Sequence, residues 1–287
     1  SLSKKRSGLI AVDSGFWIVL TGALAAGSCA LLGAFLVLRK MSLLGDALSH
    51  AILPGIAIAF LFSGSRSILP MFLGASVCGL LTTILVEAFH RKWRVQEDAS
   101  IGIVFTAFFA LGVVLITAFA GQVDLDQECV LYGEIAYVPW DILDFGGISL
   151  GPRAVWILGV VSVFNLLFVL LFYKELKISS FDPSLAITMG INATAVHYLL
   201  MGAVSFTTVA SFESVGAILV VAMMIVPGAT AYLWSDRLSL VLILSVLFGV
   251  FSAPLGYMLA AIWDSSIAGA MVVVAGSFFV VSLIIAP

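Results

Sequence analysis

Asp46 and His50 are the two residues of this sequence whose types and spacing point most directly to chemistry. They lie four positions apart in the stretch GDALSHAILPGIA, residues 45–57. Positions i and i+4 are neighbours on one surface of a helix, so a helix over this stretch would place the carboxylate beside the imidazole. A carboxylate and an imidazole oriented together form half of a site for a divalent transition metal. The pair is therefore a candidate metal site.

The elements that must position this pair are membrane-spanning helices. Of the 287 residues, 62% are hydrophobic and only 10% are charged, and the mean hydropathy is +1.21, which lies far outside the range of a soluble domain. A helical span needs roughly 20 apolar residues, and such runs follow one another here with short polar breaks. We predict an all-α polytopic membrane protein, with a polar N-terminal segment at residues 1–14 and a single transmembrane domain at residues 15–287.

About eight or nine spans fit the sequence. They are 15–37, 47–62, 68–90, 99–120, 153–173, 194–211, 214–233, 238–262 and 266–286. The second run is short and contains Pro54, and only Ser211–Glu213 separate the sixth run from the seventh. Either place could therefore hold a broken or shortened helix. Membrane-spanning strands fit poorly, because barrel strands alternate apolar and polar residues with period two and these runs do not.

His50 lies near the middle of the membrane if its helix begins at residue 41. It stands ten residues beyond Lys40, or roughly 15 Å along the axis at about 1.5 Å per residue. An ionisable side chain at this depth costs at least about 2.5 kcal/mol to insert, so it should face a cavity or a partner. Pro54 and Gly55 favour this interpretation, because interrupted helices near the midplane often expose backbone around a transported solute.

A structural role for the same pair stays open at this point. Asp46 could pair with Arg39 or Lys40 at the membrane edge, while His50 binds a backbone carbonyl in the bundle. As a metal site, two ligands from one chain are too few for tight binding. Two copies, or two related chains, meeting at a two-fold axis would bring two aspartates and two histidines to one point of a translocation path.

The distribution of charge predicts the topology. Basic residues follow the first, third and fifth spans, namely Arg39 and Lys40, then Arg91, Lys92 and Arg94, then Lys174 and Lys177. By the positive-inside rule these three loops are cytoplasmic, although Lys4, Lys5 and Arg6 would then lie outside. The loop 121–151 would face outward, and it contains acidic residues but no Lys or Arg. Asp124 and Asp126 are candidates for a metal entrance, and an ordinary solvated loop explains them equally well.

The stretch SSFDPSLAITMG, residues 179–190, is typical of a short, self-capped helix in one of the cytoplasmic loops. Asp182 is a good N-cap, Pro183 suits the first helical position, and Gly190 suits the position after the end. Such a helix is well suited to docking another protein, although an ordinary connector could have the same caps.

Four stretches together resemble the permease subunit of the manganese, zinc and iron uptake ATP-binding-cassette importers. They are RKMSLLGDALSHAILPGIAIAFL at 39–61, EDASIGIVF at 97–105, FDPSLAITMG at 181–190 and ESVGAILVVAMMIVPGATA at 213–231. The similarity runs from about residue 15 to the C-terminus. It implies a permease fold like that of the vitamin and siderophore importers, a multi-pass location in the prokaryotic cytoplasmic membrane, and function as a dimer.

The resemblance also implies a cargo and partners. Manganese or zinc, with iron as a further candidate, would arrive from an extracytoplasmic metal-binding protein, and two cytoplasmic ATPase subunits would drive its transport. The family's metal site maps onto Asp46 and His50. Its ATPase-coupling helix maps onto the segment 179–190, in which the matching residues are Phe181, Asp182, Pro183, Ser184, Leu185, Ala186 and Gly190. No permanently bound cofactor and no nucleic acid are expected.

The sequence bears on two other classes of function, an intramembrane metalloenzyme and a secondary transporter. The sequence lacks G-x-x-x-x-G-K-[ST], the loop that cradles nucleotide phosphates, so any ATP-driven motor must be a separate chain and this chain is not expected to be an enzyme. An intramembrane metalloenzyme is a poor fit, because the chain has three His and no HExxH. A secondary transporter that uses the pair as an ion relay is the main alternative. It should show two similar halves, which are not convincing here.

Other polar residues in the spans have weaker functional interpretations. Glu87 and His90 could form an exit ligand pair at the cytoplasmic end of the third span, or simply a pair at the membrane interface. Glu213 could line the metal entrance, or it could be a helix N-terminal acid favoured by the dipole. His197 is interpreted as a histidine of the bundle interior with satisfied polar contacts.

Overall fold

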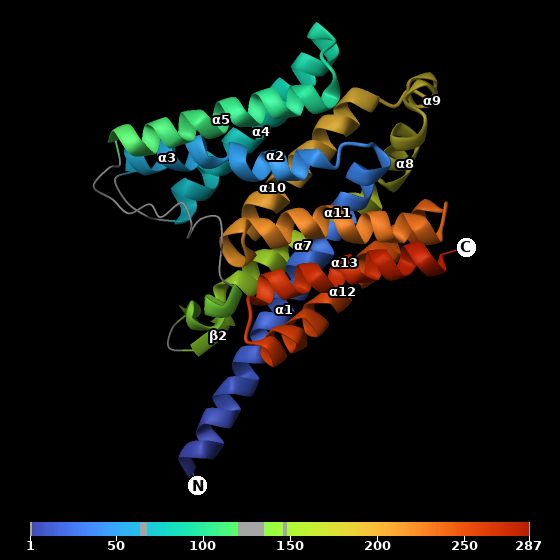
Figure 1. Cartoon of the computed structure of the whole chain (residues 1–287). Coiled ribbons are helices and arrows are strands. Elements are labelled where there is room, and N and C mark those ends of the chain that lie inside the picture. Colours follow the sequence, from blue (N-terminus) through green and yellow to red (C-terminus); the bar gives the residue numbers. More distant parts are fainter. Residues whose placement is uncertain (1, 64–67, 120–134, 146–147, 287) are drawn as a thin grey trace.

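A computed structural model of the chain describes residues 2–63, 68–119, 135–145 and 148–286. Within these ranges, nine helical segments are long and apolar enough to cross a membrane, one at each predicted run (Figure 1). The helices are α1 (Leu2–Leu38), α2 (Leu43–Ala51), α3 (Leu53–Ser63), α4 (Ile68–Trp93), α5 (Glu97–Phe119), α7 (Arg153–Leu171), α8 (Tyr173–Phe181), α9 (Pro183–Thr188), α10 (Ala193–Val215), α11 (Ala217–Trp234), α12 (Leu238–Trp263) and α13 (Ile267–Ile285).

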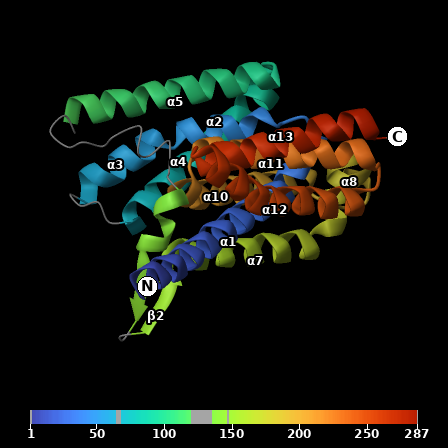
Figure 2. The same cartoon turned by 60° about the horizontal axis from the view of Figure 1, so that its bottom comes forward.

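The helices form two groups that share α10. In the larger group, α1 packs against α7, α11 and α12, and α13 packs against α11 and α12. In the other, α2 and α3 pack against α5, and α3 packs against α4, so these four lie together in both views (Figure 1, Figure 2). α10 contacts α4 and α2 on one side and α1 and α7 on the other. The candidate metal helix α2 therefore lies where the two groups meet, because it also contacts α11.

Glycines let neighbouring helices approach backbone to backbone. A Cβ atom on Gly33 of α1 would collide with the carbonyl oxygen of Met224 in α11. Gly55 of α3 and Gly74 of α4 face each other in the same way, each against the other's carbonyl oxygen. Small residues at such crossings permit the close packing that drives helix association in lipid. These contacts fix the helices that surround α2.

The second span is broken, as Pro54 predicted. α2 ends at Ala51 and α3 begins at Leu53. Proline lacks an N–H and its ring clashes with the preceding turn, so it kinks or breaks a helix. The thiol of Cys78 in α4 donates to the carbonyl of Ala51 over 3.2 Å. The break, two residues after His50, is thus supported from the neighbouring helix.

The sixth and seventh spans are separated at Gly216, and the predicted boundary at Ser211–Glu213 is wrong. α10 continues through these residues and ends at Val215. The next residue, Gly216, has a φ of 81°. Glycine adopts this backbone conformation without steric strain. Ser211 lies inside the helix, with its buried hydroxyl 3.8 Å from the thiol of Cys29. Both segments are consequently long enough to span.

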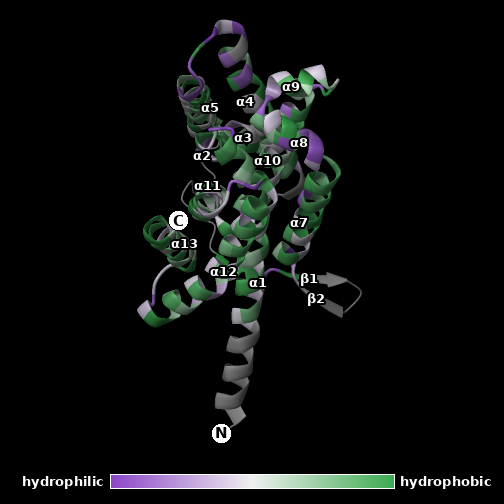
Figure 3. Cartoon of the chain, turned by 90° about the vertical axis from the view of Figure 1, so that its right-hand side faces the viewer, coloured by the Kyte–Doolittle hydropathy of each residue, from purple (hydrophilic) through white to green (hydrophobic). Residues whose placement is uncertain are grey.

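One end of the bundle gathers the polar connections. The side chain of Arg39, which follows α1, contacts Ser179 and Ser180 of α8. Hydrophilic residues also gather at α8, at α9 and at the connection from α4 to α5 in the view onto this end (Figure 3). The three loops predicted to be cytoplasmic therefore lie at the same end of the bundle.

The predicted outer loop contains local structure that the sequence did not indicate. Its described part holds a short 3-10 helix (Ile135–Trp140) and an antiparallel hairpin of β1 (Ile142–Phe145) and β2 (Ile148–Pro152). At the N-terminus, α1 begins at Leu2, so the polar N-terminal segment continues the first spanning helix.

Candidate metal site

A tight connection from α1 sets the start of α2. Lys40 has a φ of 63°, and the N–H of Met41 donates to the carbonyl of Leu36 over 2.9 Å. This is the bond of a Schellman motif, which ends a helix within a turn. α2 begins at Leu43, two residues later than the sequence suggested, so His50 lies roughly 10 Å into the helix at about 1.5 Å per residue.

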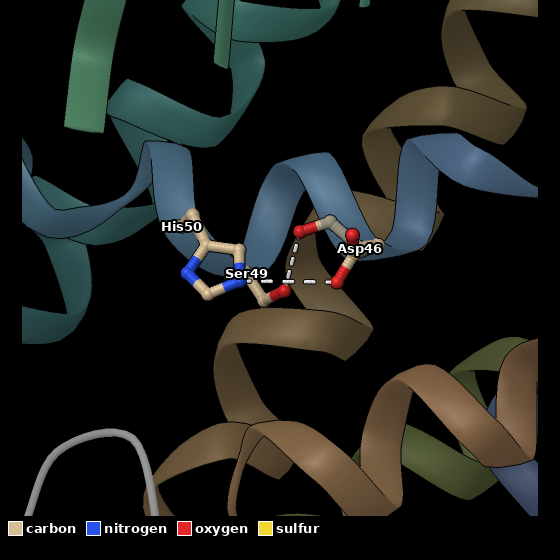
Figure 4. Close-up of polar contacts among 3 residues, drawn as sticks. All are labelled: Asp46, Ser49 and His50. Atoms are coloured by element: carbon tan, nitrogen blue, oxygen red, sulfur yellow. Dashed lines mark hydrogen bonds and ion pairs between the residues drawn. The ribbon is translucent and has the colours of Figure 1, made fainter. Parts of the chain in front are cut away.

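Asp46 and His50 lie side by side on one face of α2, as their spacing predicted (Figure 4). The Oδ1 atom of Asp46 is 3.8 Å from Nε2 of His50. The side chain of Asp46 is 51% exposed and that of His50 is 32% exposed, whereas Leu44 and Leu48 of the same helix are fully buried. Two groups able to bind a cation therefore project from the surface of a single chain, beside the break in its second span.

Two aromatic rings of α5 hold the imidazole of His50. Its ring centroid is 5.6 Å from that of Phe109, in an edge-to-face arrangement, and 6.0 Å from that of Phe105. On the other side, the hydroxyl of Ser49 donates to the backbone carbonyl of Asp46 (Figure 4). That hydroxyl is thus directed to the backbone. The rings limit the rotation of His50 while part of its imidazole stays accessible.

The donor set fits a divalent transition metal but is incomplete in one chain. Imidazole and carboxylate together accept manganese, iron or zinc. Within the described part of the chain, no group of three or more His, Cys, Asp or Glu residues could hold a metal ion. A half-exposed carboxylate inside a membrane-spanning segment should meet water or a partner and not lipid. The geometry therefore favours a site that a second polypeptide completes.

Of the two cations that could neutralise Asp46, Arg39 and Lys40, the structure directs Arg39 elsewhere. The guanidinium of Arg39 donates instead to the hydroxyls of Ser179 and Ser180 and to Nδ1 of His197, at 2.9 to 3.1 Å. The partner of the Asp46 carboxylate is His50, one turn further along the same helix.

Glu87 and His90 are directed to different partners, so the structure does not bring them together as an exit pair. Oε2 of Glu87 lies 2.9 Å from Nε2 of His197, although the two atoms lack the alignment of a hydrogen bond. Nδ1 of His90 lies 3.0 Å from the carbonyl oxygen of Val95. His197 is buried, as predicted for the bundle interior, but its Nε2 atom lacks a hydrogen-bond partner, so the prediction of satisfied polar contacts holds only for Nδ1.

The predicted docking helix is present as α9, and its start has the expected cap. Oδ1 of Asp182 accepts from the N–H groups of Ser184 and Leu185, both at 3.0 Å. Pro183 is the first residue of the helix, where its missing N–H leaves no further donor unpaired. The side chain of Asp182 therefore fixes where α9 begins.

The end of α9 also agrees with the sequence. Gly190 has a φ of 78°, and the N–H of Ile191 donates to the carbonyl of the buried Ala186 over 2.9 Å, which is again a Schellman motif. The helix and its flanks expose large apolar side chains at the polar end of the bundle. These are Phe181, Leu185, Ile187 and Met189.

The remaining candidates are Glu213 and two aspartates of the predicted outer loop. Glu213 is exposed and belongs to the last turns of α10. The helix dipole disfavours a negative charge at this end, so the explanation of Glu213 as a helix N-terminal acid is wrong. Asp124 and Asp126 lie outside the described residues.

Sequence reasoning missed the residues that shape the site from other helices. Phe105 and Phe109 come from α5 and Cys78 from α4, and each is an ordinary apolar residue within its own span. One signal was available: Phe105 and Phe109 are four residues apart, so they share a helix face in the same way as Asp46 and His50.

The chain matches one protein family over nearly its whole length and is similar to metal transport proteins of that kind. Residues 13–286 match the ABC 3 transport family. The chain is 49% identical to the manganese transport system membrane protein MntD of Bacillus subtilis, over 94% of this chain and 92% of that protein. It is 43% identical to the zinc transport system membrane protein TroD of Treponema pallidum, over 94% of this chain and 73% of that protein.

Solved structures show the same fold. PsaBC from Streptococcus pneumoniae, solved in complex with Fab, is 34% identical with a TM-score of 0.79, and the match covers 100% of this chain and 97% of the other. A protein described as a metal-chelate type ABC transporter, in an inward-facing conformation, has a TM-score of 0.63 at 15% identity. That match covers 94% of this chain and 85% of the other, and at this identity it shows a likeness of fold alone.

Proposed function

This chain belongs to the ABC 3 transport family, and from that premise we propose that it is the membrane-spanning subunit of an ATP-driven importer for a divalent transition metal ion. The observation that supports this most directly is the exposed pair of Asp46 and His50 on a broken span. The protein is a multi-pass permease of the prokaryotic plasma membrane, and a metal crossing it needs polar ligands part of the way through the hydrocarbon.

Manganese or zinc is the proposed cargo, with iron as a third candidate. Relatives at 49% and 43% identity are named for manganese and for zinc transport. A carboxylate and an imidazole bind all three ions, and intrinsic affinity rises from manganese to zinc. Selectivity must therefore come from the geometry of the completed site and from the protein that delivers the ion.

The complete metal site would lie between two permease chains. One chain offers one carboxylate and one imidazole on an exposed face, and a two-fold axis beside that face would double the set. With two Asp46 and two His50 side chains around one ion, the carboxylate of each chain would be covered by the other chain and would not face lipid. The second chain is either another copy or a sister permease.

Two cytoplasmic ATPase subunits would supply the energy, one at each permease chain. α9 offers a rigid, capped helix with exposed apolar side chains at the polar end of the bundle, and this suits a docking contact. An extracytoplasmic metal-binding protein would deliver the ion at the opposite end, near the loop 121–151.

A transport cycle follows from these parts. ATP binding would draw the two motors together, displace both α9 helices and open the path outward. The metal would then pass the acidic loop and pause between the two Asp46 and His50 pairs. ATP hydrolysis would return the helices and release the ion inward. A secondary transporter would use the same pair with a proton gradient and would need no α9 partner.

Metal uptake into proteoliposomes tests this proposal. The vesicles hold this chain with its second permease and its ATPase, and metal-loaded binding protein is added outside. Radiolabelled manganese and zinc uptake is compared for the wild type, Asp46→Ala and His50→Ala. We expect uptake by the wild type to require ATP, and each substitution to abolish uptake while the ATPase still co-purifies.

Two results would contradict the proposal. Uptake that follows a proton gradient without ATP would favour the secondary transporter, and normal uptake by both variants would remove the metal site from this pair. Leu167→Ala, which shortens an exposed apolar side chain of α7, is a matched control and should transport like the wild type.

A further inference from the structure

Arg39 connects the segment that would receive the movement of the motor with the helix that would hold the metal. Its Nε donates to the hydroxyl of Ser180 over 3.0 Å, and one terminal nitrogen donates to the hydroxyl of Ser179 over 2.9 Å. The other terminal nitrogen lies 3.1 Å from Nδ1 of His197. The planar guanidinium holds its donors in a fixed fork, so these three contacts define the position of Arg39 relative to α8 and α10.

The contact with Arg39 also fixes the tautomer of His197. A guanidinium nitrogen can only donate, so Nδ1 of His197 must accept and the ring proton of the neutral imidazole lies on Nε2. That nitrogen lies 2.9 Å from Oε2 of Glu87 without the alignment of a hydrogen bond, and the two side chains are only 9% and 5% exposed. α1, α4, α8 and α10 therefore meet at one largely buried polar group, the Arg39 cluster, which consists of Arg39, Glu87, Ser179, Ser180 and His197.

On one side, the cluster is joined to α9 by a few residues. Ser179 and Ser180 lie in the last turn of α8, just before the N-cap Asp182. The N–H of Asp182 donates to the carbonyl of Ile178 over 2.9 Å, so α8 passes into α9 without a loose connection. Figure 1 shows α8 and α9 together at the end of the bundle where α1 ends. A displacement of α9 would therefore move both serines.

On the other side, the cluster is joined to α2 by a tight connection. Only Arg39–Ser42 separate α1 from α2. The bond from Met41 to Leu36 closes this segment, and the N–H of Leu44 donates to the carbonyl of Met41 over 3.1 Å. Asp46 stands only seven residues after Arg39. A pull on the guanidinium would reach the metal-binding face of α2 with little slack.

We propose that Arg39 is a positioning residue that transmits the displacement of α9 to Asp46 and His50. The inference rests on the proposed importer function and deepens it, because it assigns the link between motor and metal site to one side chain. Movement of α8 would draw Arg39 through its two serine contacts, while His197 and Glu87 hold the guanidinium in line. Without Arg39, α9 could move while α2 stayed in place, and ATP would be hydrolysed without metal crossing.

The experiment measures metal uptake and ATP hydrolysis in the same proteoliposomes, with the complete complex and metal-loaded binding protein outside. The probe is radiolabelled manganese. We expect Arg39→Ala to raise the ATP hydrolysed per manganese ion imported by at least about fivefold, the lower end of typical couplings between sites. Manganese bound by the detergent-solubilised complex should stay at the wild-type level. Arg39→Lys keeps the charge but not the fork, so it should restore the ratio only in part.

Two further variants keep the test decisive. Lys40→Gln removes the neighbouring exposed cation and should leave the ratio unchanged. If Arg39→Ala fails to assemble, the double substitution Ser179→Ala with Ser180→Ala replaces it, because it removes two acceptors and leaves all charges in place. This variant should also raise the ratio.

The outcomes separate this inference from the proposed function. A wild-type ratio in Arg39→Ala or in the serine double variant overturns the inference, and so does a loss of uptake and hydrolysis in equal proportion, which a purely structural role would cause. ATP-independent uptake by the wild type, or normal uptake by Asp46→Ala, would overturn the importer proposal itself.

Discussion

At the residue scale, the two histidines with acidic neighbours show how surroundings decide a role. His50 and Asp46 are partly exposed and their side chains stand 3.8 Å apart, so a cation could approach both. His197 and Glu87 are buried at 2.9 Å, and the guanidinium of Arg39 already provides the positive charge beside them. Similar residue types therefore suit a metal ligand pair in one place and a fixed internal contact in the other.

A prediction at this scale concerns the N-cap Asp182. Its carboxylate accepts from two backbone N–H groups of α9, and replacing such a cap by Ala costs about 1 kcal/mol of helix stability. We expect Asp182→Ala to weaken binding of the ATPase subunit by roughly fivefold, which is the factor that corresponds to this energy. The measurement is titration of the purified ATPase onto the permease in nanodiscs.

Asp182→Asn is the matched control, because Asn caps about as well as Asp but has no charge. It should bind the ATPase like the wild type. Equal weakening by Ala and Asn would show that the charge of Asp182 matters and that its cap does not.

At the element scale, the site depends on how α2 and α3 are held at their break. Pro54 lies in the first turn of α3, where a proline favours the start of a new helix, and the thiol of Cys78 donates to the carbonyl of Ala51 from α4. Gly55 and Gly74 bring α3 and α4 into backbone contact just beyond that point. The break is therefore part of the packed structure, and it separates the helix that carries Asp46 and His50 from α3.

Gly55→Ala is predicted to destabilise the permease. Its Cβ would meet the carbonyl of Gly74 and would lie 2.6 Å from the Cβ of Cys78, and such overpacking costs about 1 to 3 kcal/mol. We expect a lower Tm in detergent, measured by differential scanning fluorimetry with a thiol-independent dye. Gly159→Ala in α7 is the control, because nothing lies within 4 Å of its added Cβ. A Tm for Gly55→Ala that matches or exceeds that of the control would contradict the packing argument.

At the scale of the whole molecule, the described chain is a bundle of two helix groups with an unfinished site on its surface. α10 joins the groups and α2 lies where they meet, so a relative movement of the groups would act on α2. The polar end holds α9 and the Arg39 cluster, while the metal pair lies further along the bundle. This arrangement suits a protein that works only in an assembly.

The proposed pairing of two permease chains makes a geometric prediction. If two Asp46 residues face one ion, Asp46→Cys in both chains should place two thiols within reach of a short bifunctional thiol reagent. We expect a cross-linked dimer on a non-reducing gel, from a background in which Cys129 is replaced by Ser. For a sister permease, the aligned position is substituted in that chain.

Leu167→Cys is the control for this experiment, because Leu167 is an exposed apolar residue of α7 in the helix group that does not contain Asp46. It should give no cross-linked dimer. Efficient cross-linking through position 167 and none through position 46 would place the interface on another face and leave the metal site incomplete.

The sequence by itself determined the features that depend on neighbours along the chain. Hydrophobic runs predicted all nine spans within the described residues, because length and apolarity are local properties. Pro54 predicted the break, and Asp182 with Gly190 predicted α9, because caps and prolines act on adjacent backbone. The i, i+4 spacing placed Asp46 beside His50, since any α-helix makes these positions neighbours.

Only the tertiary structure decided which residues from different helices meet. It turned the metal pair outward, placed Phe105 and Phe109 against His50, and directed Arg39 to α8 and α10 instead of to Asp46. It also moved a helix boundary from Ser211–Glu213 to Gly216, which adopts a positive φ. Contacts of this kind join residues that are far apart in sequence, and no local pattern along the chain specifies their pairing.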